Sequence, residues 1–501
     1  MNNYIYEWGI KYIVNIICYV LDSLRADHIS CYGYGRETSP TIDALADQGV
    51  RFDHCVSPST WTRPVAASIL SGLYPAVHRT RTTEDLFSPP VPTLPEALSE
   101  LGYTTVGFES MPNINSEFGY GRGFDDYHDL FEWDEIVEKR PNAPQFDDGT
   151  PLTRAEDLNK GFRHWYGERG DDNPFFALLW SNEPHIPFSP PEGFREYLDL
   201  EYDGPVNTEP QHFSQNEFVE SDADRQHLIN LYDCEIRYND HCLRNLFDFL
   251  RSEGLYEETM IVVVGDHGEA FWEHDVFGHG TNVPPYSEVV QVPGVVRLPD
   301  GVAGQTVKEP VSLIDLYPTI VECARESAPV DADHEPVPDV QGQSLATALH
   351  GDSLELDRSV FAESYHEQEY GSVDEWYAVI DDTWKYLTFE PGRRETENFF
   401  GMLKPLFSPG TLKRVLRNPL TYLGRHVDPD DSALLFDLET DPSEHDSVAN
   451  KHPERTAQMH NLIDSWKEEC TELRMTIGTD IKSVELDDEM RDQLEQLGYL
   501  T

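Results

Sequence analysis

Three apolar segments constrain the fold of this chain more than any other feature. They are residues 13–21 (IVNIICYVL), 175–180 (FFALLW) and 260–264 (MIVVV). Runs of this length that are rich in β-branched and aromatic side chains, and that lack a 3.6-residue repeat, indicate buried strands. Residues 12–323 alternate such runs with helical patterns. This alternation predicts an α/β fold with a mostly parallel central sheet covered by helices on both faces.

Side chains that suit a metal ion or an acid–base reaction follow each of these segments. Asp22 comes directly after the first, His185 shortly after the second, and Asp266 and His267 after the third. Ligands of open α/β sheets bind beyond the carboxyl ends of the strands, so we expect these side chains to share one site. Carboxylates are ligands for Ca²⁺, Mg²⁺ or Mn²⁺. The alternative for Asp22 is a helix cap or an ion pair with Arg25.

The segment Asp266-His267-Gly268-Glu269 offers adjacent oxygen and nitrogen ligands on a turn. A glycine there allows the backbone to approach an ion closely. The alternative is an ordinary turn between a strand and a helix.

Thr62, in STWTRPVAASILSGLYP, stands at the expected start of a helix, because Pro64 suits a first helical turn. A hydroxyl at such a start faces free N–H groups and the positive end of the helix dipole. These features favour an alkoxide or a bound oxyanion. The alternative role for Thr62 is simple capping of the helix.

Two histidines are the candidates for acid–base work. His185 lies in NEPHIPF and His279 in FGHG. A histidine with a pKa near neutrality can protonate a departing alkoxide or hold an anionic ester oxygen. His28, His78 and His274 fall in the same regions and rank below these two.

The charge of the chain excludes some partners. The 501 residues include 92 acidic and 37 basic side chains, for a net charge of −55. Such a surface repels nucleic acid at ordinary ionic strength. Concentrated salt screens the repulsion, so the composition indicates a halophilic protein that works at molar salt. The alternative is an acidic protein from a cell with moderate salt.

The cysteines and the N-terminus bear on the compartment. Seven cysteines without a CxxC pair argue against a disulfide framework and a thiolate zinc site. The N-terminal MNNYIYEWGIKYIV lacks a basic segment, an Arg pair and a small-residue cleavage site. No apolar stretch approaches the roughly 20 residues that span a bilayer. We therefore expect a cytoplasmic protein with no transmembrane segment.

The pattern divides the chain into a catalytic domain, 1–350, and a smaller C-terminal α+β module, 351–501. In the first we expect helices at 38–52 (ending at Gly49), 221–253 and 311–323, a helix stopped by Gly102 and followed by a strand within 91–110, and an exposed loop at 324–343. In the second we expect strands within 376–390 and 433–439 and helices at 452–474 and 486–497.

The segment 393–425 departs from the acidic background, because it combines basic residues with Phe, Leu and Met. Such an insert suits docking of a polyanionic substrate, a membrane surface or a second subunit of a homo-oligomer. The alternative is a helical hairpin packed on the protein's own core.

Taken together and in order, the motifs resemble those of the sulfatase family of the alkaline phosphatase superfamily. The resemblance covers nearly the whole chain. It rests on IICYVLDSLRADHISCYGYGRETSPTIDALADQGVRF, TRPVAASILSGLYP, PFFALLWSNEPHIPFSPP, IVVVGDHGEAFWEHDVFGHG, VPGVVRLP, VSLIDLYPTI, QGQSLATAL, LFDLETDPSEHD and a terminal QLEQLGYL.

The resemblance implies metal-assisted hydrolysis of a sulfate or phosphate ester. One divalent ion, Ca²⁺ by preference and Mn²⁺ or Mg²⁺ otherwise, polarises the ester and its nucleophile. Asp22, Asp266 and His267 match the metal ligands. His185 and His279 match positions that contact the ester group or the leaving oxygen. The substrate is then a small-molecule, glycan or lipid ester.

Two departures from the family pattern concern the nucleophile and its surroundings. Ser23 replaces the second Asp of the usual Asp-Asp pair, and Ala66 stands where the C/S-x-P-x-R signature has its arginine. Thr62 occupies the position of the Cys or Ser that becomes formylglycine. Oxidation of Thr gives a ketone, so we do not expect formylglycine chemistry. Relatives similar to lipoteichoic acid synthases place a Thr there and form a phosphothreonine.

The sequence thus predicts a sulfatase-like ester hydrolase in which Thr62 attacks directly. A sulfated Thr is hard to resolve without a second hydroxyl, which favours a phosphate ester or phosphoryl transfer of the phosphoglycerol transferase kind. We assign substrate binding to Arg63 and His78. Arg63, Arg79 and Arg81 are candidates for the missing signature arginine, and the alternative for all three is a surface position or an acidic partner. The alternative is a non-catalytic binder of sulfated or phosphorylated ligands, because a fold does not establish activity.

Overall fold

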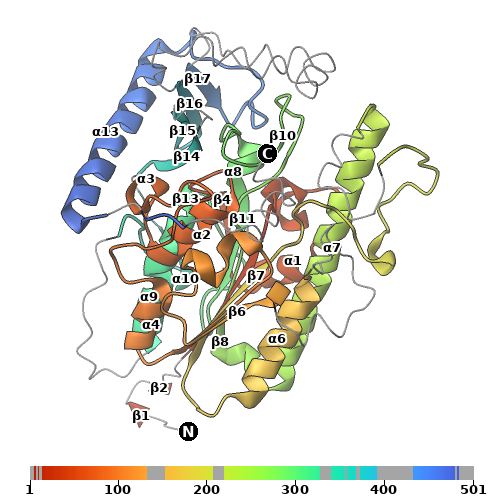
Figure 1. The fold of residues 1–501 in the computed structure, drawn as a ribbon, viewed down its shortest axis with the longest axis vertical. Coiled ribbons are helices and arrows are strands. Elements are labelled where there is room, and N and C mark those ends of the chain that lie inside the picture. Colours follow the sequence, from red (N-terminus) through yellow and green to blue (C-terminus); the bar gives the residue numbers. More distant parts are fainter. Residues whose placement is uncertain are drawn as a thin grey trace.

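The computed structural model describes residues 5–6, 9–10, 14–132, 153–206, 219–327, 340–354, 356, 358–367, 373–391, 433–479 and 482–484. Within these ranges a central sheet of nine strands lies between two layers of helices, and a four-stranded antiparallel sheet packs beside a long helix (Figure 1). This confirms the α/β fold with a mostly parallel sheet and a C-terminal α+β module. The expected insert at 393–425 and the expected helix at 486–497 lie outside the described residues, and so does most of the loop at 324–343.

The three apolar segments form the centre of the large sheet. They are β3 (Asn15–Leu21), β7 (Phe175–Ser181) and β8 (Thr259–Gly265), and every residue of each is buried. β3 lies between the other two and is parallel to both. The sequence prediction of three buried parallel strands is therefore confirmed.

The remaining strands extend this sheet on both sides. The order is β12 (Gln305–Val307), β4 (Val50–Val56), β11 (Gln291–Arg297), β8, β3, β7, β5 (Thr104–Glu109) and β6 (Asp126–Asp129), with β13 (Val311–Ser312) also on β4. β11 runs antiparallel to both β4 and β8, which is the departure from an all-parallel sheet.

Alternation along β3 divides the core into two layers. Cys18 and Val20 pack into one apolar cluster with α2 (Thr62–Ser71), α4 (Leu94–Glu100) and α9 (Leu316–Ser327). Ile17 and Tyr19 pack into the other with α1 (Pro40–Ala46), α6 (Ala155–Glu168) and α7 (Asp222–Ser252). Successive side chains of a strand point to opposite faces, so one buried strand supports both layers.

Two helix boundaries differ from the sequence prediction. The first helix ends at Ala46, three residues before Gly49. Gly49 instead precedes β4, where an added Cβ would lie 2.3 Å from the carbonyl oxygen of Val296. The helix expected from residue 311 begins at Leu316. The residues before it pair with β4, and a capping box, in which the backbone N–H of Ser312 donates to Asp315 over 2.8 Å, starts a short 3-10 turn.

The second sheet consists of β14 (Val360–Glu367), β15 (Val373–Asp381), β16 (Trp384–Glu390) and β17 (Ala433–Asp437), covered by α13 (Pro453–Ile477). It lies at the top of Figure 1, above the central sheet. Shorter elements are β1 (Ile5–Tyr6), β2 (Gly9–Ile10), α3 (Pro75–His78), β9 (Ala270–Phe271), β10 (Phe277–Gly278), α8 (Ser287–Val290) and α10 (Ala346–Leu349).

The second sheet contacts the loop that leads into α2. The backbone N–H of Glu363, on β14, donates to Pro58 over 3.0 Å, and the hydroxyl of Ser59 donates back to the carbonyl of Glu363 over 2.9 Å. The C-terminal module thus supports the segment that carries Thr62. Among the described helices, none has the length and apolar character needed to cross a membrane.

Candidate active site

The carboxyl ends of the central strands bring two carboxylates together. Asp22 follows β3, and its backbone N–H donates to Ser181 at the end of β7 over 3.0 Å. Asp266 follows β8, and its N–H donates to Leu21 at the end of β3 over 3.3 Å. Parallel pairing therefore continues one residue beyond the strands and fixes both aspartates at the same edge of the sheet.

Thr62 is the first residue of α2 and lies between these strand ends. Its Oγ1 donates to Asp22 Oδ2 over 3.1 Å and lies 3.2 Å from His267 Nε2. The N-cap residue of α2 is Trp61 and not Thr62, and its side chain makes no capping hydrogen bond to the helix. The positive end of the α2 dipole faces this hydroxyl and favours negative charge on it. The hydroxyl therefore belongs to the polar cluster at the sheet edge, 40 residues away from Asp22 in the sequence.

Asp22, Asp266 and His267 form a compact set of potential ligands. Their ligand atoms all lie within 4.8 Å of one another, and all three side chains are buried. His267 Nδ1 is 2.9 Å from the carbonyl oxygen of Gly268, so Nδ1 carries the proton and donates. The lone pair of Nε2 then faces Asp22 and Asp266, at 3.6 and 3.3 Å. Asp266 Oδ2 is buried and has no hydrogen-bond partner among the described residues.

Burial destabilises the charged forms of Asp22 and Asp266. Burial raises the pKa of Asp22 from 3.8 to about 6. Burial and the charge of Asp22 also raise the pKa of Asp266 well above its ordinary value. The pKa of His267 is lowered by burial and by the charge of His279, so the imidazole is neutral and can act as a ligand. Two buried carboxylates, a neutral imidazole and one orphaned oxygen fit a divalent cation.

Ser23 and Trp180 orient the carboxylates. The backbone N–H of Ser23 donates to Asp266 Oδ1 over 2.9 Å, and its hydroxyl donates to Asp22 Oδ1 over 3.1 Å. The φ angle of Ser23 is +62°, a left-handed conformation that costs free energy in a non-glycine residue. The indole of Trp180 donates to Asp22 Oδ2 over 3.3 Å. Ser23 thus holds both aspartates, although it cannot supply the second carboxylate of the usual pair.

His279 and His185 lie beside this set. The ring centroid of His279 is 4.4 Å from that of His267 and 4.8 Å from that of His185. His279 Nδ1 is 3.0 Å from Glu269 Oε2. Burial alone would lower the pKa of His279, but the charge and hydrogen bond of Glu269 raise it. His185 bonds to the carbonyl of Ile186 through Nδ1, and burial and His279 lower its pKa well below the ordinary value. The site thus combines a histidine that favours the charged form with two neutral ones.

The two side chains assigned to substrate binding have other contacts. The guanidinium of Arg63 donates to the carbonyls of Asn113 and Thr83 and lies 3.7 Å from the ring centroid of Phe118. His78 Nδ1 accepts from the N–H of Thr80 over 3.1 Å, and Nε2 is 3.0 Å from Ser68 Oγ. Burial lowers the pKa of His78 to about 3, so it is neutral. A substrate role for Arg63 and His78 stays a prediction.

The surroundings of Asp22 and Gly268 bear on the alternative roles that the sequence left open, an ion pair of Asp22 with Arg25 and an ordinary turn at Gly268. Arg25 pairs with Asp27 and Glu273, with Nη2 2.8 Å from the former carboxylate and Nη1 2.5 Å from the latter. Gly268 is required because an added Cβ would lie 2.1 Å from the carbonyl oxygen of Glu288. The close approach that this glycine permits is thus to neighbouring backbone.

The sequence predicted Glu269 as part of the turn with Asp266 and His267 but not its contact with His279, and it assigned no role to Trp180. Glu269 is fully buried against His279, and Trp180 bonds to Asp22. Each carries a signal in the sequence: Glu269 is an acidic residue next to the candidates Asp266 and His267, and Trp180 is an aromatic residue with a polar N–H shortly before His185. Only the fold shows which atoms they reach.

A family model described as Sulfatase matches residues 14–326. The chain belongs to the sulfatase family. As a sulfatase-family member it is an ester hydrolase by class, and the matched region contains every residue of the site described above. The prediction of this family from the motifs is confirmed.

Related proteins share the family and the fold. The chain is 24% identical over 360 residues to the ulvan-active sulfatase of Formosa agariphila, covering 69% of this chain and 66% of that enzyme. A protein solved in complex with its substrate D-glucosamine-2-N,6-O-disulfate is 17% identical to this chain in sequence. The two structures superpose with a TM-score of 0.68 over 92% of this chain and 98% of the other. The phosphonate monoester hydrolase of Agrobacterium radiobacter is 20% identical with a TM-score of 0.63, covering 95% and 98%.

Proposed function

We propose that this sulfatase-family protein is a metal-dependent hydrolase in which Thr62 attacks a phosphoric, phosphonic or sulfuric ester, with phosphorus esters preferred. The observation that carries the proposal is the position of Thr62 Oγ1, 3.1 Å from Asp22 and 3.2 Å from the unprotonated nitrogen of His267. A threonine that only capped its helix would not place its hydroxyl among the ligand atoms of two other elements.

The residues of the site have separate roles in the proposed reaction. Asp22, Asp266 and His267 would hold one divalent cation, Ca²⁺ by preference and Mn²⁺ or Mg²⁺ otherwise. When bound, the cation neutralises the carboxylates and polarises both the ester and the attacking hydroxyl. Asp22 Oδ2 accepts the hydrogen bond of Thr62 and orients the oxygen at the N-terminus of α2. The helix end supplies fixed positive partial charge to the oxygen as it becomes nucleophilic.

His279 supports departure of the leaving group. Its Nδ1 lies 3.0 Å from Glu269, which orients the ring, and we assign to the imidazole the donation of a proton to the leaving group or a contact with an ester oxygen. The raised pKa of this imidazole keeps more of it in the charged form at neutral pH. His185, which lies against His279, orients it and lines the same side of the site.

The chemistry of the nucleophile favours a phosphorus ester. Attack by Thr62 on phosphorus gives a phosphothreonine, in which water can attack phosphorus to release the product. A sulfated threonine lacks the second hydroxyl through which a formylglycine hydrate expels sulfate. A structural relative solved as a phosphonate monoester hydrolase supports this preference. Relatives that act on ulvan or contain a disulfated glucosamine support a glycan ester as an alternative substrate class.

An activity panel tests the proposal. Aryl sulfate, aryl phosphate, bis-aryl phosphate and aryl phosphonate are offered in molar KCl, with and without Ca²⁺ or Mn²⁺, as the halophilic composition requires. We expect metal-dependent turnover of a phosphorus ester, a loss of about 10³-fold or more in Thr62→Ala with metal binding retained, and partial activity in Thr62→Ser. Thr347→Ala, the same change at an exposed position on α10, is the matched control.

A non-catalytic binder gives a different result. The wild type would then bind the esters and turn over none of them, with or without metal. Equal turnover by the wild type and Thr62→Ala would also contradict the proposal, because another group would then be the nucleophile.

A further inference from the structure

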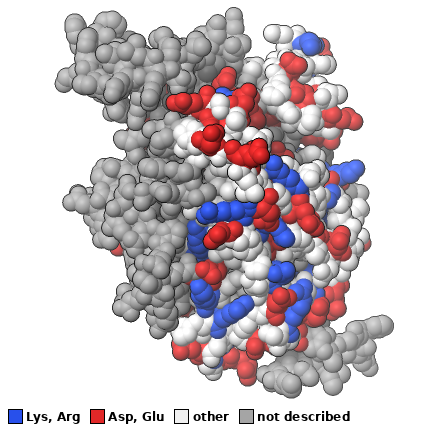
Figure 2. All heavy atoms as spheres, turned by 90° about the vertical axis from the view of Figure 1, so that its right-hand side faces the viewer, with Lys and Arg blue, Asp and Glu red and all other residues white. Residues whose placement is uncertain are grey.

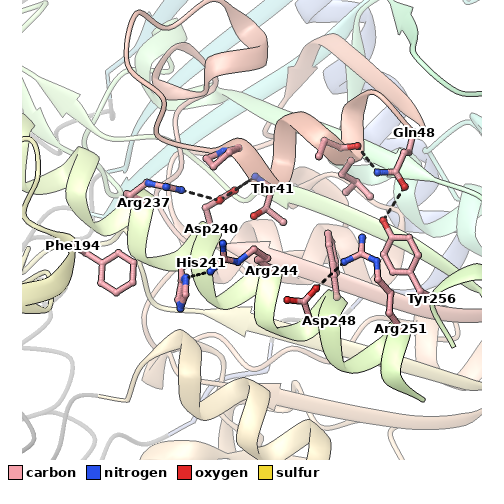
Figure 3. Close-up of a pocket in the computed structure, with 14 residues that line it drawn as sticks. Thr41, Gln48, Phe194, Arg237, Asp240, His241, Arg244, Asp248, Arg251 and Tyr256 are labelled. Carbon is pink, nitrogen blue, oxygen red and sulfur yellow. Dashed lines mark hydrogen bonds and ion pairs between the residues drawn. The ribbon is translucent and has the colours of Figure 1, made fainter. Parts of the chain in front are cut away.

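A cavity of about 340 Å³ lies between α1 and α7 (Figure 3). On its inner face α7 carries Tyr232, whose hydroxyl donates to Ser23 over 2.7 Å. The cavity lies beside the C-terminal half of the same helix and contains none of the catalytic candidates. Its volume is in the range of small-molecule sites, roughly 300 Å³ and above.

The cavity is unusually basic for a chain of net charge −55. Arg237, Arg244 and Arg251 line it at intervals of seven residues along α7, so all three lie on one side of the helix. Figure 2 shows that the face carrying α6 and α7 presents Lys and Arg among its acidic side chains. The lining carboxylates, Asp240 and Asp248, are fewer than the arginines.

The lining carboxylates are already engaged. Asp240 Oδ1 accepts from the backbone N–H groups of Thr41 and Ile42 over 2.9 and 3.0 Å and so occupies the N-terminus of α1. Asp248 is 3.1 Å from the guanidinium of Arg251. Neither carboxylate is within ion-pair distance of Arg244. The lining therefore retains positive charge at Arg244.

Arg244 has a histidine as its partner. Its Nη2 donates to His241 Nδ1 over 2.8 Å, so this nitrogen is unprotonated. Burial and the neighbouring Arg244 and Arg237 lower the pKa of His241. Within the described residues, Arg244 contacts no carboxylate within 4 Å. A guanidinium without an acidic partner, on a strongly acidic chain, attracts an anion.

The remaining wall of the cavity is apolar and partly aromatic. Leu45 comes from α1 and Phe247 from α7, and the ring centroid of Phe194 lies 5.0 Å from that of His241. Figure 3 shows Phe194 and His241 at one end of the cavity and Tyr256 at the other, with the Arg244 side chain between them. Leu45 and Phe247 are almost fully buried, and the accessible apolar lining comes from Pro40, Ala44 and Phe194. An inorganic anion would leave these side chains uncovered, whereas a ring would cover them.

We propose that the cavity between α1 and α7 binds a small organic monoanion, in which one carboxylate-like group pairs with Arg244 and a ring-sized apolar part packs against Pro40, Ala44 and Phe194. One guanidinium that has no acidic partner among the described residues matches a single negative charge. The binding site is independent of the chemistry at Thr62.

Fluorine NMR of the full-length protein in KCl tests the proposal with two probes of equal shape. 4-Fluorobenzoate carries the charge, and 4-fluorobenzamide is its neutral match. We expect saturable line broadening with 4-fluorobenzoate and at least about fivefold weaker binding of the amide. Arg244→Gln should weaken 4-fluorobenzoate binding by about fivefold or more, whereas Arg225→Gln should leave it unchanged. Arg225 is exposed on the same helix but does not line the cavity.

A second variant keeps the test independent of the arginine. Ala44→Phe fills the cavity from α1 and leaves its charges in place. We expect this variant to lose binding of 4-fluorobenzoate while circular dichroism shows a folded protein. Equal affinity for the acid and the amide, equal losses in the Arg244 and Arg225 variants, or unchanged binding in Ala44→Phe would each overturn the proposal.

Discussion

Replacement of Asp22 by Asn should stabilise the protein when metal is removed, although Asp22 is a candidate ligand. In the folded protein, burial raises the pKa of Asp22 from 3.8 to about 6. A folded-state pKa above the unfolded one means that folding favours the protonated carboxyl. Its contribution to stability is fully present below about pH 3.8 and is lost as the pH rises through about 6.

The magnitude follows from this difference in pKa. About two pKa units correspond to roughly 3 kcal/mol of destabilisation once the folded carboxyl is ionised. About half of this penalty is already present at pH 5, because the unfolded carboxyl is ionised there while the folded one is not. An amide oxygen can still accept hydrogen bonds at this position. We therefore expect metal-free Asp22→Asn to be more stable than the wild type by roughly 3 kcal/mol at pH 7.5 and by about half of that at pH 5.

The assay is urea unfolding in chelator at constant molar KCl, at both pH values. Asp47→Asn, the same change at an exposed position, corrects for the lower net charge of the variant. For a chain of 501 residues, 3 kcal/mol also corresponds to roughly 3 °C in unfolding temperature. Saturating Ca²⁺ should reverse the order, because the wild type gains binding free energy that the variant lacks.

Two results would refute this reasoning. A metal-free variant that is less stable than the wild type at pH 7.5 would mean that the carboxylate is favourably solvated or paired. A stability difference that does not change between pH 5 and pH 7.5 would mean that Asp22 does not titrate in this range. Either result would remove the electrostatic argument for a cation at this site.

Two further predictions concern a histidine of the site and a buried ion pair that begins on β16 of the second sheet. Glu269→Gln should lower the pKa of His279, because it removes the charge that raises this pKa. Since His279 is proposed to act as a proton donor, the high-pH limb of the kcat/KM–pH profile should move to lower pH. A limb that does not move would assign that titration to another group. Lys385→Met leaves the carboxylate of Glu444, 2.7 Å away and fully buried, without its cation, and should cost about 3–5 kcal/mol in urea unfolding. The double change Lys385→Met/Glu444→Leu should recover part of this loss; a single variant as stable as the wild type would contradict the ion-pair argument.

The central strands and the clustering of Asp22 with Asp266 and His267 were predictable because their signals are local. A buried parallel strand is apolar along its whole length, as β3, β7 and β8 are, and its carboxyl end fixes where the next residue lies. The sequence alone therefore predicts that Asp22 and Asp266 lie at the same edge of the sheet. The order of motifs then identified the family over nearly the whole chain.

Side-chain direction was harder to predict because it depends on tertiary contacts. Arg63 directly follows Thr62, yet its guanidinium reaches carbonyls of residues 83 and 113, since the helix points consecutive side chains about 100° apart. The contact of Glu269 with His279 depends on a hairpin between β9 and β10 that brings residues ten apart together. The cavity beside α7 likewise depends on the packing of α1 against a helix some 200 residues later.

Anomalous diffraction from crystals soaked in Mn²⁺ tests the central claim most directly, because it locates the cation without assuming its ligands. We predict one peak at the carboxyl ends of β3 and β8, roughly 2.0–2.6 Å from oxygens of Asp22 and Asp266 and from His267 Nε2, with Thr62 Oγ1 beside it. The peak should be absent in Asp266→Asn crystals treated in the same way. A Mn²⁺ peak elsewhere in the molecule, or none at this edge of the sheet, would contradict the account.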